Sequence, residues 1–384
     1  MGGKGVIAFF ICASILVSCW LTSKGGVSAL FFKFITTTVM STSPSSNRRN
    51  FLKTLAGLTA GMMIPYRGLS VTGKGSAIKD RIGERLPLRK LGNTGEKVTM
   101  LGLGGYHIGW TDEAKARETI EAALEGGVRF FDNAESYSDG LSEERYGKYL
   151  VPHYRDEIFL MTKTYSTDPA TTRKHLEGSL RRLKTDQLDL WQVHSLQSPS
   201  DTDTRIDNGV LDVIAEAKKS GKVRYVGFTG HNDPHAHARM LDKTGEEFFD
   251  TCQHPINIID AIVNPSFIDM IVPRLLERKM GVLAMKTLAD GRFFSKKVQQ
   301  GDVIWDTNQP VVPDHLTIEE ALAFAWSLPI SVLITGAENP QLIREKVTMA
   351  RRFEKLTEKD RAALIDRVAD VSSKGDVEYY KNPG

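Results

Sequence analysis

Residues 128–163 read VRFFDNAESYSDGLSEERYGKYLVPHYRDEIFLMTK, and this stretch decides the fold. An apolar run, Val128–Phe131, ends in Asp132, and the next apolar run, Ile158–Thr162, ends in Lys163. Short apolar runs that alternate with helical patterns indicate parallel strands joined by crossover helices. The stretch therefore predicts two neighbouring parallel strands, each of which delivers a charged side chain at its end.

The same pattern continues in both directions along the chain. Eight strand-like runs alternate with helical segments over about 250 residues, the size of a (β/α)8 TIM barrel. The other strand-like runs are Leu101–Leu103, Leu188–Val193, Val223–Phe228, Phe249–Cys252, Val282–Met285 and Val332–Ile334. The helical segments include Glu113–Glu125, Pro169–Leu183, Val210–Lys219, Phe267–Arg278, Ile318–Leu328 and Pro340–Arg352.

A hairpin precedes the array. The turn-forming sequence Gly92-Asn93-Thr94-Gly95 separates the runs Leu86–Leu91 and Lys97–Leu101. The alternative architecture, a doubly wound sheet, predicts a glycine fingerprint after the first strand, but His107 stands where the third glycine would be. We therefore predict a single α/β barrel over residues 86–352 with an N-terminal capping β-hairpin, followed by a C-terminal helix and tail over 353–384.

Charge and cysteine usage divide the chain into a leader and a body. The 384 residues carry a formal net charge of +3, but residues 1–79 hold nine Lys and Arg and no acidic residue. Subtracting these from the totals of 50 and 47 leaves 41 basic and 47 acidic groups in residues 80–384, a net of −6. A nucleic-acid-binding body is excluded, because phosphate binding needs clustered positive charge. Only Cys252 of the three cysteines lies in the body, and no Cys/His spacing is typical of a structural zinc site.

The basic leader contains two targeting patterns. Val6–Leu21 is an uncharged run typical of a secretory signal, and Cys19 closes a lipobox-like tetrapeptide. The segment Asn47–Lys53, which contains the pair Arg48-Arg49, resembles a twin-arginine export motif, and a weakly apolar stretch follows it.

Met40 stands seven residues before the twin-arginine motif, so we expect residues 1–39 to be a mis-assigned start. We expect the twin-arginine export machinery to carry the protein to the periplasm, or to the outer side of the inner membrane with the signal still attached. The alternatives are lipidation at Cys19, and a cytoplasmic protein whose residues 1–79 form a basic disordered tail.

Four residues form a candidate catalytic group. Asp132, Lys163 and His194 follow three consecutive strands at intervals of 31 residues, so they should meet at the C-terminal mouth of the barrel. Tyr137 follows Asp132 by five residues and can reach the same mouth. A phenol, whose ordinary pKa is near 10, can donate a proton at neutral pH when a cation stabilises its oxyanion. Lys163 can supply that charge, Asp132 can hold Lys163, and His194 can orient a carbonyl oxygen.

The pattern shows neither a metal-ligand cluster nor a Ser or Cys nucleophile beside a base, so proton donation to a carbonyl implies a cofactor that brings hydride. The histidines 231, 235 and 237 invite a metal interpretation, but Pro234 indicates that a helix starts between them, which favours a polar loop and a first helical turn.

Two segments resemble the signatures of the aldo-keto reductase superfamily. Phe130–Tyr137 resembles the first, and His175–Leu183, which runs on to Asp189–His194, resembles the second. The hairpin Arg89–Gly95 is similar to the barrel-capping hairpin of that family. The resemblance covers roughly residues 86–352 and implies a barrel that binds NADP(H), less often NAD(H), across its mouth.

The resemblance also implies roles for single residues. Tyr137 becomes the general acid and base, tuned by Lys163 and Asp132, while His194 aids substrate orientation. The cofactor-binding positions fall on Thr229, Gln253, Met285, Lys286, Gly336 and Glu345. We expect the substrate to be a small-molecule carbonyl or alcohol, with Tyr106 and Trp110 in its pocket. The long loop Asp290–Asp314, which includes Phe293, Phe294 and Trp305, should fold over the cofactor or the substrate.

Several positions depart from the family pattern. Gly230 and Met285 replace the asparagine and the aromatic residue expected beside the nicotinamide. Leu342 replaces the arginine that commonly holds the 2′-phosphate, which leaves NADP and NAD both open, with Arg344 and Lys346 as substitute cations. We expect an oxidoreductase that takes hydride from nicotinamide and a proton from Tyr137. The alternative is a cofactor-binding sensor or regulatory subunit with little turnover.

Overall fold

The computed structural model describes residues 78–291, 293, 312, 315–371 and 378–381. Both targeting patterns of the leader lie outside these residues. So does most of the loop Asp290–Asp314, including Phe294 and Trp305. Within the described part of the chain, no helix has the length and apolar character needed to cross a membrane.

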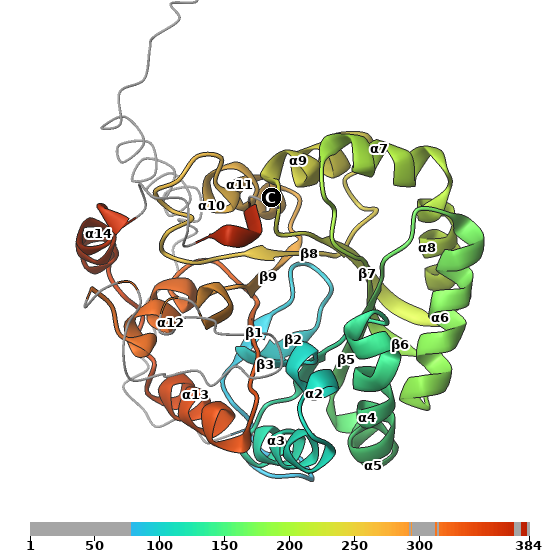
Figure 1. Ribbon diagram of the computed structural model, residues 1–384, viewed down its shortest axis with the longest axis horizontal. Coiled ribbons are helices and arrows are strands. Elements are labelled where there is room, and N and C mark those ends of the chain that lie inside the picture. The colour runs from blue at the N-terminus through green and yellow to red at the C-terminus, as the bar shows by residue number, and fades with distance from the viewer. Residues whose placement is uncertain (1–77, 292, 294–311, 313–314, 372–377, 382–384) are drawn as a thin grey trace, which may run out of the picture. The chain divides into compact units, whose positions relative to one another are not determined.

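Eight parallel strands close into a barrel, as the sequence predicts (Figure 1). Their order around the barrel is β10-β3-β4-β5-β6-β7-β8-β9, so neighbours in the chain are neighbours in the sheet and the last strand closes on the first. The strands are β3 Leu101–Gly104, β4 Phe130–Asp132, β5 Phe159–Thr164, β6 Leu188–Val193, β7 Val223–Thr229, β8 Thr251–Pro255, β9 Gly281–Met285 and β10 Val332–Thr335.

Helices surround the barrel and join successive strands (Figure 1). They are α2 Tyr106–Trp110, α3 Glu113–Glu125, α4 Leu141–Tyr149, α5 Val151–Tyr154, α6 Pro169–Leu183, α7 Pro199–Asp207, α8 Val210–Lys219, α9 Pro234–Lys243, α10 Phe267–Met270, α11 Val272–Glu277, α12 Ile318–Trp326, α13 Pro340–Arg352 and α14 Glu358–Arg367. Side-chain caps fix several starts: Asp112, Asp168 and Ser198 each accept a hydrogen bond from a backbone N–H in the first turn.

The bounds of several predicted elements differ from the structure, for example at β4, which starts at Phe130, and two differences have a clear cause. The predicted helix Phe267–Arg278 is broken at Ile271, because Pro273 lacks the backbone N–H that a continuous helix needs and instead lies in the first turn of α11. Strand β8 starts two residues later than predicted and runs on to Pro255, through Gln253 and His254. Hydrophobicity alone misses those polar positions, since they are buried by tertiary packing.

The hairpin closes the N-terminal end of the barrel. Strands β1 Leu88–Lys90 and β2 Lys97–Thr99 pair antiparallel, as the turn sequence predicts. Leu91 and Val98 pack with apolar side chains from inside the barrel: Phe130, Phe159, Met161, Leu190, Leu283, Val332 and Ile334. This end is therefore a sealed hydrophobic core, which leaves the opposite end for chemistry.

Two glycines of the hairpin turn allow a matched test of this packing. Both have positive φ, +53° at Gly92 and +85° at Gly95, but a Cβ on Gly92 would lie 2.5 Å from the backbone nitrogen of Gly281, whereas one on Gly95 meets nothing within 4 Å. Gly95→Ala should cost about 1 kcal/mol of unfolding free energy from backbone strain alone. Gly92→Ala should cost roughly 1–3 kcal/mol more, because the hairpin must move off strand β9.

Urea unfolding of both variants measures the difference. Equal losses of stability would show that the hairpin does not pack tightly against the barrel.

Candidate active site

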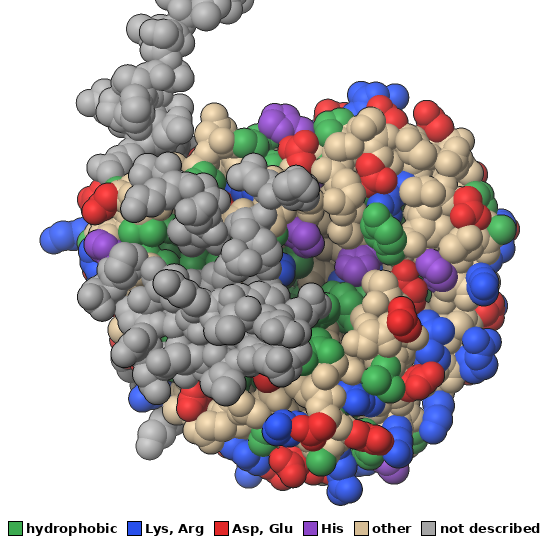
Figure 2. Space-filling model, viewed as in Figure 1, with side chains coloured by type: hydrophobic (Ala, Val, Ile, Leu, Met, Phe, Trp, Pro, Cys, Tyr) green, Lys and Arg blue, Asp and Glu red, His purple; other side chains and the backbone are tan. Residues whose placement is uncertain are grey.

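A cavity of about 420 Å³ opens at the C-terminal ends of the barrel strands. All four predicted catalytic residues, Asp132, Tyr137, Lys163 and His194, line it. Histidine side chains lie near the centre of the face shown in Figure 2. The structure thus brings together residues that the sequence spaces one βα unit apart.

Lys163 is the hub of this group. Its side chain is only 1% exposed, and its Nζ lies 2.5 Å from Oδ1 of Asp132. Nζ also donates hydrogen bonds to the backbone oxygen of Asn133, at 2.7 Å, and to Oη of Tyr137, at 3.2 Å. Because an ammonium group can only donate, the phenol oxygen accepts from Lys163 and the phenol proton remains available to another oxygen.

Tyr137 is held by a tight turn between β4 and α4. The 3-10 segment η1, Tyr137–Gly140, places Ser138 and Asp139 in the left-handed region at φ values of 50° and 54°. This turn points the phenol back over the barrel, where its ring makes edge contacts with Tyr106 at 5.5 Å and with His194 at 5.7 Å between ring centroids. Local backbone strain of this kind is common where a functional side chain must be aimed.

Burial and neighbouring charges set the protonation states. Burial raises the pKa of Tyr137 to about 12, even though Lys163 opposes the shift. Burial works against the charge of Lys163, but Asp132 and Tyr137 together outweigh it and raise the pKa of this amine. Burial, helped by the positive charge of Lys163, lowers the pKa of His194 well below its usual range. At neutral pH the site therefore holds a protonated phenol, a charged lysine and a neutral imidazole.

The predicted cofactor positions line the same cavity: Thr229, Gln253, Met285, Lys286, Gly336 and Glu345. Among the described residues, the buried Oε1 of Gln253 and the buried Oγ1 of Thr287 have no hydrogen-bond partner. Gly336 lies so close to His107 that a Cβ there would meet the imidazole at 2.1 Å. Free polar atoms, the Lys286 cation and the N-terminus of α13 along one cavity fit a dinucleotide with an amide at one end and phosphates farther along.

Three side chains near the predicted 2′-phosphate position lie in different environments. Leu342 lines the cavity, and Arg344 is exposed with its nearest carboxylate, Glu125, 3.8 Å away. Lys346 is buried and donates to the backbone oxygen of Gly336 at 2.7 Å, and burial lowers its pKa to about 8. Lys346 is thus the cation of this pair that reaches the cavity.

The predicted substrate residues and the histidine trio take separate places. Tyr106 lines the cavity, whereas Trp110 is not part of the lining and contacts the rings of Tyr106 and His107 from behind. Of the trio, His231 lines the cavity and His237 is buried in the core. His235 lies at the surface beside Asp233, at 2.9 Å. The three imidazoles thus lie in three different environments.

One pair of residues in the cavity wall was not predicted from the sequence. His107, at the start of α2, lies 3.2 Å from the carboxylate of Glu338, which follows β10. Ser195 and Thr287 also line the cavity without having been singled out. His107 follows the first barrel strand much as His194 follows β6, and this strand-end position is the signal that could have found it.

Comparison with known proteins identifies the family of this chain. Residues 100–368 match the Aldo/keto reductase family. The chain is 26% identical to the uncharacterized oxidoreductase YqkF of Bacillus subtilis, covering 72% of this chain and 94% of that protein. It is also 26% identical to L-galactose dehydrogenase of Arabidopsis thaliana, covering 71% and 90%.

Solved structures share the fold. The holo form of aldo-keto reductase AKR11C1 from Bacillus halodurans superimposes with a TM-score of 0.61 at 23% identity, over 74% of this chain and 96% of that one. An aldo/keto reductase from Klebsiella pneumoniae, solved with NADP and acetate, gives a TM-score of 0.57 at 22% identity, over 73% and 95%.

The barrel and its polar mouth define a (β/α)8 enzyme with its site at the strand C-termini. The family match covers well over half of the chain, and the chain belongs to the aldo/keto reductase family, oxidoreductases that act on carbonyl and alcohol groups.

The buried ion pair allows a stability test that does not depend on activity. Lys163→Met leaves the Asp132 carboxylate buried without its partner, which should cost about 3–5 kcal/mol of unfolding free energy. Burial already raises the pKa of Asp132. Because a raised folded-state pKa means that the folded protein holds the proton more tightly, the deficit should shrink as the pH falls through that pKa.

Urea unfolding at several pH values measures this deficit, with Asp132→Asn/Lys163→Met as the control that removes both charges. A single variant as stable as the double variant at neutral pH would contradict a buried, charged pair.

Proposed function

We propose that the protein transfers a hydride between NADP(H) and a small-molecule carbonyl or alcohol, with Tyr137 as the proton donor. The observation that carries this proposal is the hydrogen bond from Nζ of Lys163 to Oη of Tyr137 at 3.2 Å, inside a buried ion pair with Asp132. It leaves the phenol proton free and places a positive charge beside the oxygen that must become negative.

The residues of this chain act on the carbonyl oxygen. The phenol of Tyr137 donates its proton to that oxygen, and Lys163 stabilises the phenolate as it forms. The neutral imidazole of His194, in edge contact with Tyr137, donates a second hydrogen bond and orients the oxygen. When bound, the dinucleotide supplies the hydride to the carbonyl carbon. The reverse sequence oxidises an alcohol.

The cofactor proposal rests on the cavity and on the family. The unpartnered Oε1 of Gln253 suits the carboxamide of nicotinamide, and Thr229 lies on the neighbouring strand at the same register position. Lys286 and the N-terminus of α13 suit the phosphates. Buried Lys346 is the best-placed cation for a 2′-phosphate, and the Klebsiella pneumoniae structure, which was solved with NADP, supports NADP(H) ahead of NAD(H).

Tyr137→Phe tests the mechanism directly. The variant should bind NADPH with unchanged affinity but reduce 4-nitrobenzaldehyde about 10²–10⁴-fold more slowly, because only the transferable proton is lost. Single-turnover oxidation of NADPH, followed by its fluorescence, separates hydride transfer from cofactor release.

Tyr149→Phe is the matched control, since that phenol lies on the outside of the barrel and hydrogen bonds to Glu113. Equal single-turnover rates for Tyr137→Phe and wild type would overturn the assignment of Tyr137. They would favour a cofactor-binding protein whose turnover is incidental.

We also propose that the leader exports the folded barrel with its cofactor already bound. The basis is the pair Arg48-Arg49 in an otherwise weakly apolar leader, together with the fact that twin-arginine transport carries folded proteins.

In a bacterial host, Arg48→Lys/Arg49→Lys should abolish export of the full chain, while Arg67→Lys, outside the motif, should leave it unchanged. The exported protein should carry NADP(H), measured by chromatography after denaturation. Export of the double variant at the wild-type level would contradict the twin-arginine route.

A further inference from the structure

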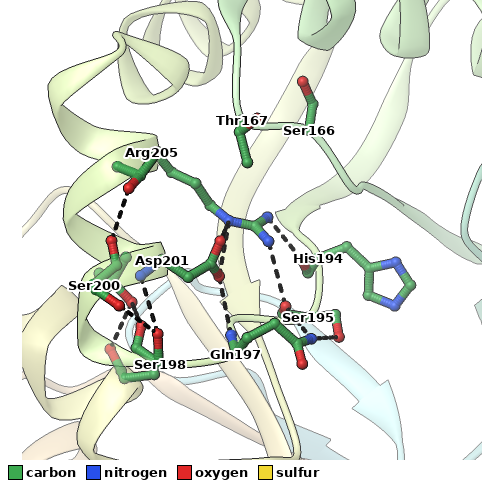
Figure 3. Close-up of polar contacts among 12 residues, drawn as sticks. Ser166, Thr167, His194, Ser195, Gln197, Ser198, Ser200, Asp201 and Arg205 are labelled. Atoms are coloured by element: carbon green, nitrogen blue, oxygen red, sulfur yellow. Dashed lines mark hydrogen bonds and ion pairs between the residues drawn. The ribbon is translucent and has the colours of Figure 1, made fainter.

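Arg205, on helix α7, is a buried arginine that the chemistry above does not use. Its side chain is 0% exposed, and its guanidinium points toward the turn that contains His194 and Ser195 (Figure 3). Nε donates to both carboxylate oxygens of Asp201, at 3.0 and 3.1 Å. Nη1 donates to the backbone oxygen of His194 at 2.9 Å, and Nη2 donates to that of Ser195 at 3.4 Å. Burying a cation is costly, so such a complete set of partners indicates a specific task.

The two carbonyl groups that Arg205 holds belong to a strained turn. Ser195 adopts a φ of +56°, which is uncommon for a residue with a side chain. The side chain of Gln197 donates to the backbone oxygen of Ser195 at 2.8 Å and to its Oγ at 2.7 Å. The backbone N–H of Gln197 donates in turn to Asp201 at 3.0 Å. The turn is thus closed by a ring of contacts that runs through Asp201 and Arg205 (Figure 3).

The backbone of the turn is also fixed to the barrel on both sides. The N–H of His194 donates to the oxygen of Thr164 at 2.9 Å, and the N–H of Leu196 donates to that of Thr229 at 2.8 Å. These two hydrogen bonds fix the position of the His194 Cα. The rotation of the peptide group between His194 and Ser195 then depends on the hydrogen bonds that the His194 carbonyl oxygen accepts. Arg205 supplies one of them, and the imidazole lies on the other side of the chain, toward the cavity (Figure 3).

We propose that Arg205 is a positioning residue for His194: it holds the strained turn of residues 194–197 so that the imidazole faces the Tyr137 phenol. This role rests on the proposed function, because it matters for catalysis only if His194 orients the carbonyl oxygen. Arginine suits the task better than lysine, since its planar fork reaches a carboxylate and two carbonyl oxygens at once. The ring of Tyr165 also packs against the fork, with its centroid 5.1 Å from the guanidinium carbon.

Arg205 also contributes to the charge that His194 experiences. The titratable and charged groups around this imidazole are Lys163 on β5, the phenols of Tyr137 and Tyr165, His231 after β7 and, across the backbone, Arg205 on α7. Burial is the main reason why the pKa of His194 is low, and Lys163, His231 and Arg205 add to it. Removing the guanidinium should therefore raise the pKa of His194 and move the acidic limb of the kcat profile to higher pH.

Arg205→Met and Arg205→Lys test the proposal in the full chain. With NADPH and 4-nitrobenzaldehyde, Arg205→Met should lower kcat about 100-fold, because a misplacement of about 1 Å at the reacting centre has an effect of that size. The affinity for NADPH should not change. Arg205→Lys keeps the charge but not the fork, so kcat should again fall while the pKa of His194 moves less than in Arg205→Met.

Arg239→Met is the matched control. Arg239, on α9, makes an ion pair of 2.7 Å with Asp203, which lies two residues after Asp201 on α7. The side chain of Arg239 is partly exposed and lies outside the active-site turn. This variant should keep wild-type kcat, NADPH affinity and His194 pKa, which shows that losing an arginine on this helix pair is not harmful in itself.

NMR titration of the imidazole signals, with His194→Asn used for assignment, gives a readout that does not depend on turnover. A higher pKa and a shifted His194 signal in Arg205→Met, with normal far-UV circular dichroism, would support the proposal. An unchanged pKa and an unchanged kcat would overturn it. If the proposed function itself were wrong, wild type would fail to oxidise NADPH with the aldehyde while the NMR difference between variants persisted.

Discussion

The structure depends on one buried ion pair, between Lys163 and Asp132. Two charges can leave water only when their geometry compensates the loss of hydration, and here Nζ and Oδ1 lie 2.5 Å apart with both side chains almost fully buried. The register of β4 and β5 pairs Phe131 with Leu160, so Lys163 attaches two residues, about 6.6 Å, beyond the level of Asp132. Only a long side chain that folds back over the barrel can reach both the carboxylate and the phenol of Tyr137.

The two ends of the closed barrel have different roles: one is a packed apolar core and the other holds the polar cavity. At the N-terminal end, Leu91 and Val98 of the hairpin join the inner apolar cluster, and the indole Nε1 of Trp326 donates to the backbone oxygen of Met100 at 3.1 Å. At the other end, strands finish in polar side chains that apolar packing cannot satisfy. The polar groups of the cavity are tolerated because the sealed end and the surrounding helices supply the hydrophobic stabilisation.

The sequence predicts the barrel and the catalytic group because both follow local rules. Each strand is a short apolar run, and a polar residue at its end, such as Asp132 or Lys163, necessarily reaches the mouth. The same rule could have found His107, but its pairing with Glu338 could not be predicted, since barrel closure alone brings the first and last strands together. The role of Arg205 is harder still to predict: besides Asp201, its partners are backbone carbonyl groups, which carry no sequence signal.

The protonation states of Tyr137 and His194 determine which chemistry the site can perform. Burial raises the pKa of Tyr137 to about 12 and lowers that of His194 well below its usual range, so both groups are neutral donors at physiological pH. Two neutral donors facing one oxygen gain strength as that oxygen becomes negative, whereas a positively charged imidazole would also attract water and anions. In the proposed mechanism, the positive charge that stabilises the developing phenolate is on Lys163, which contacts the phenol oxygen through a hydrogen bond. In the mechanism proposed above, this separation of the donors from the charge would let the site release an alcohol and, once Tyr137 regains its proton, begin another cycle.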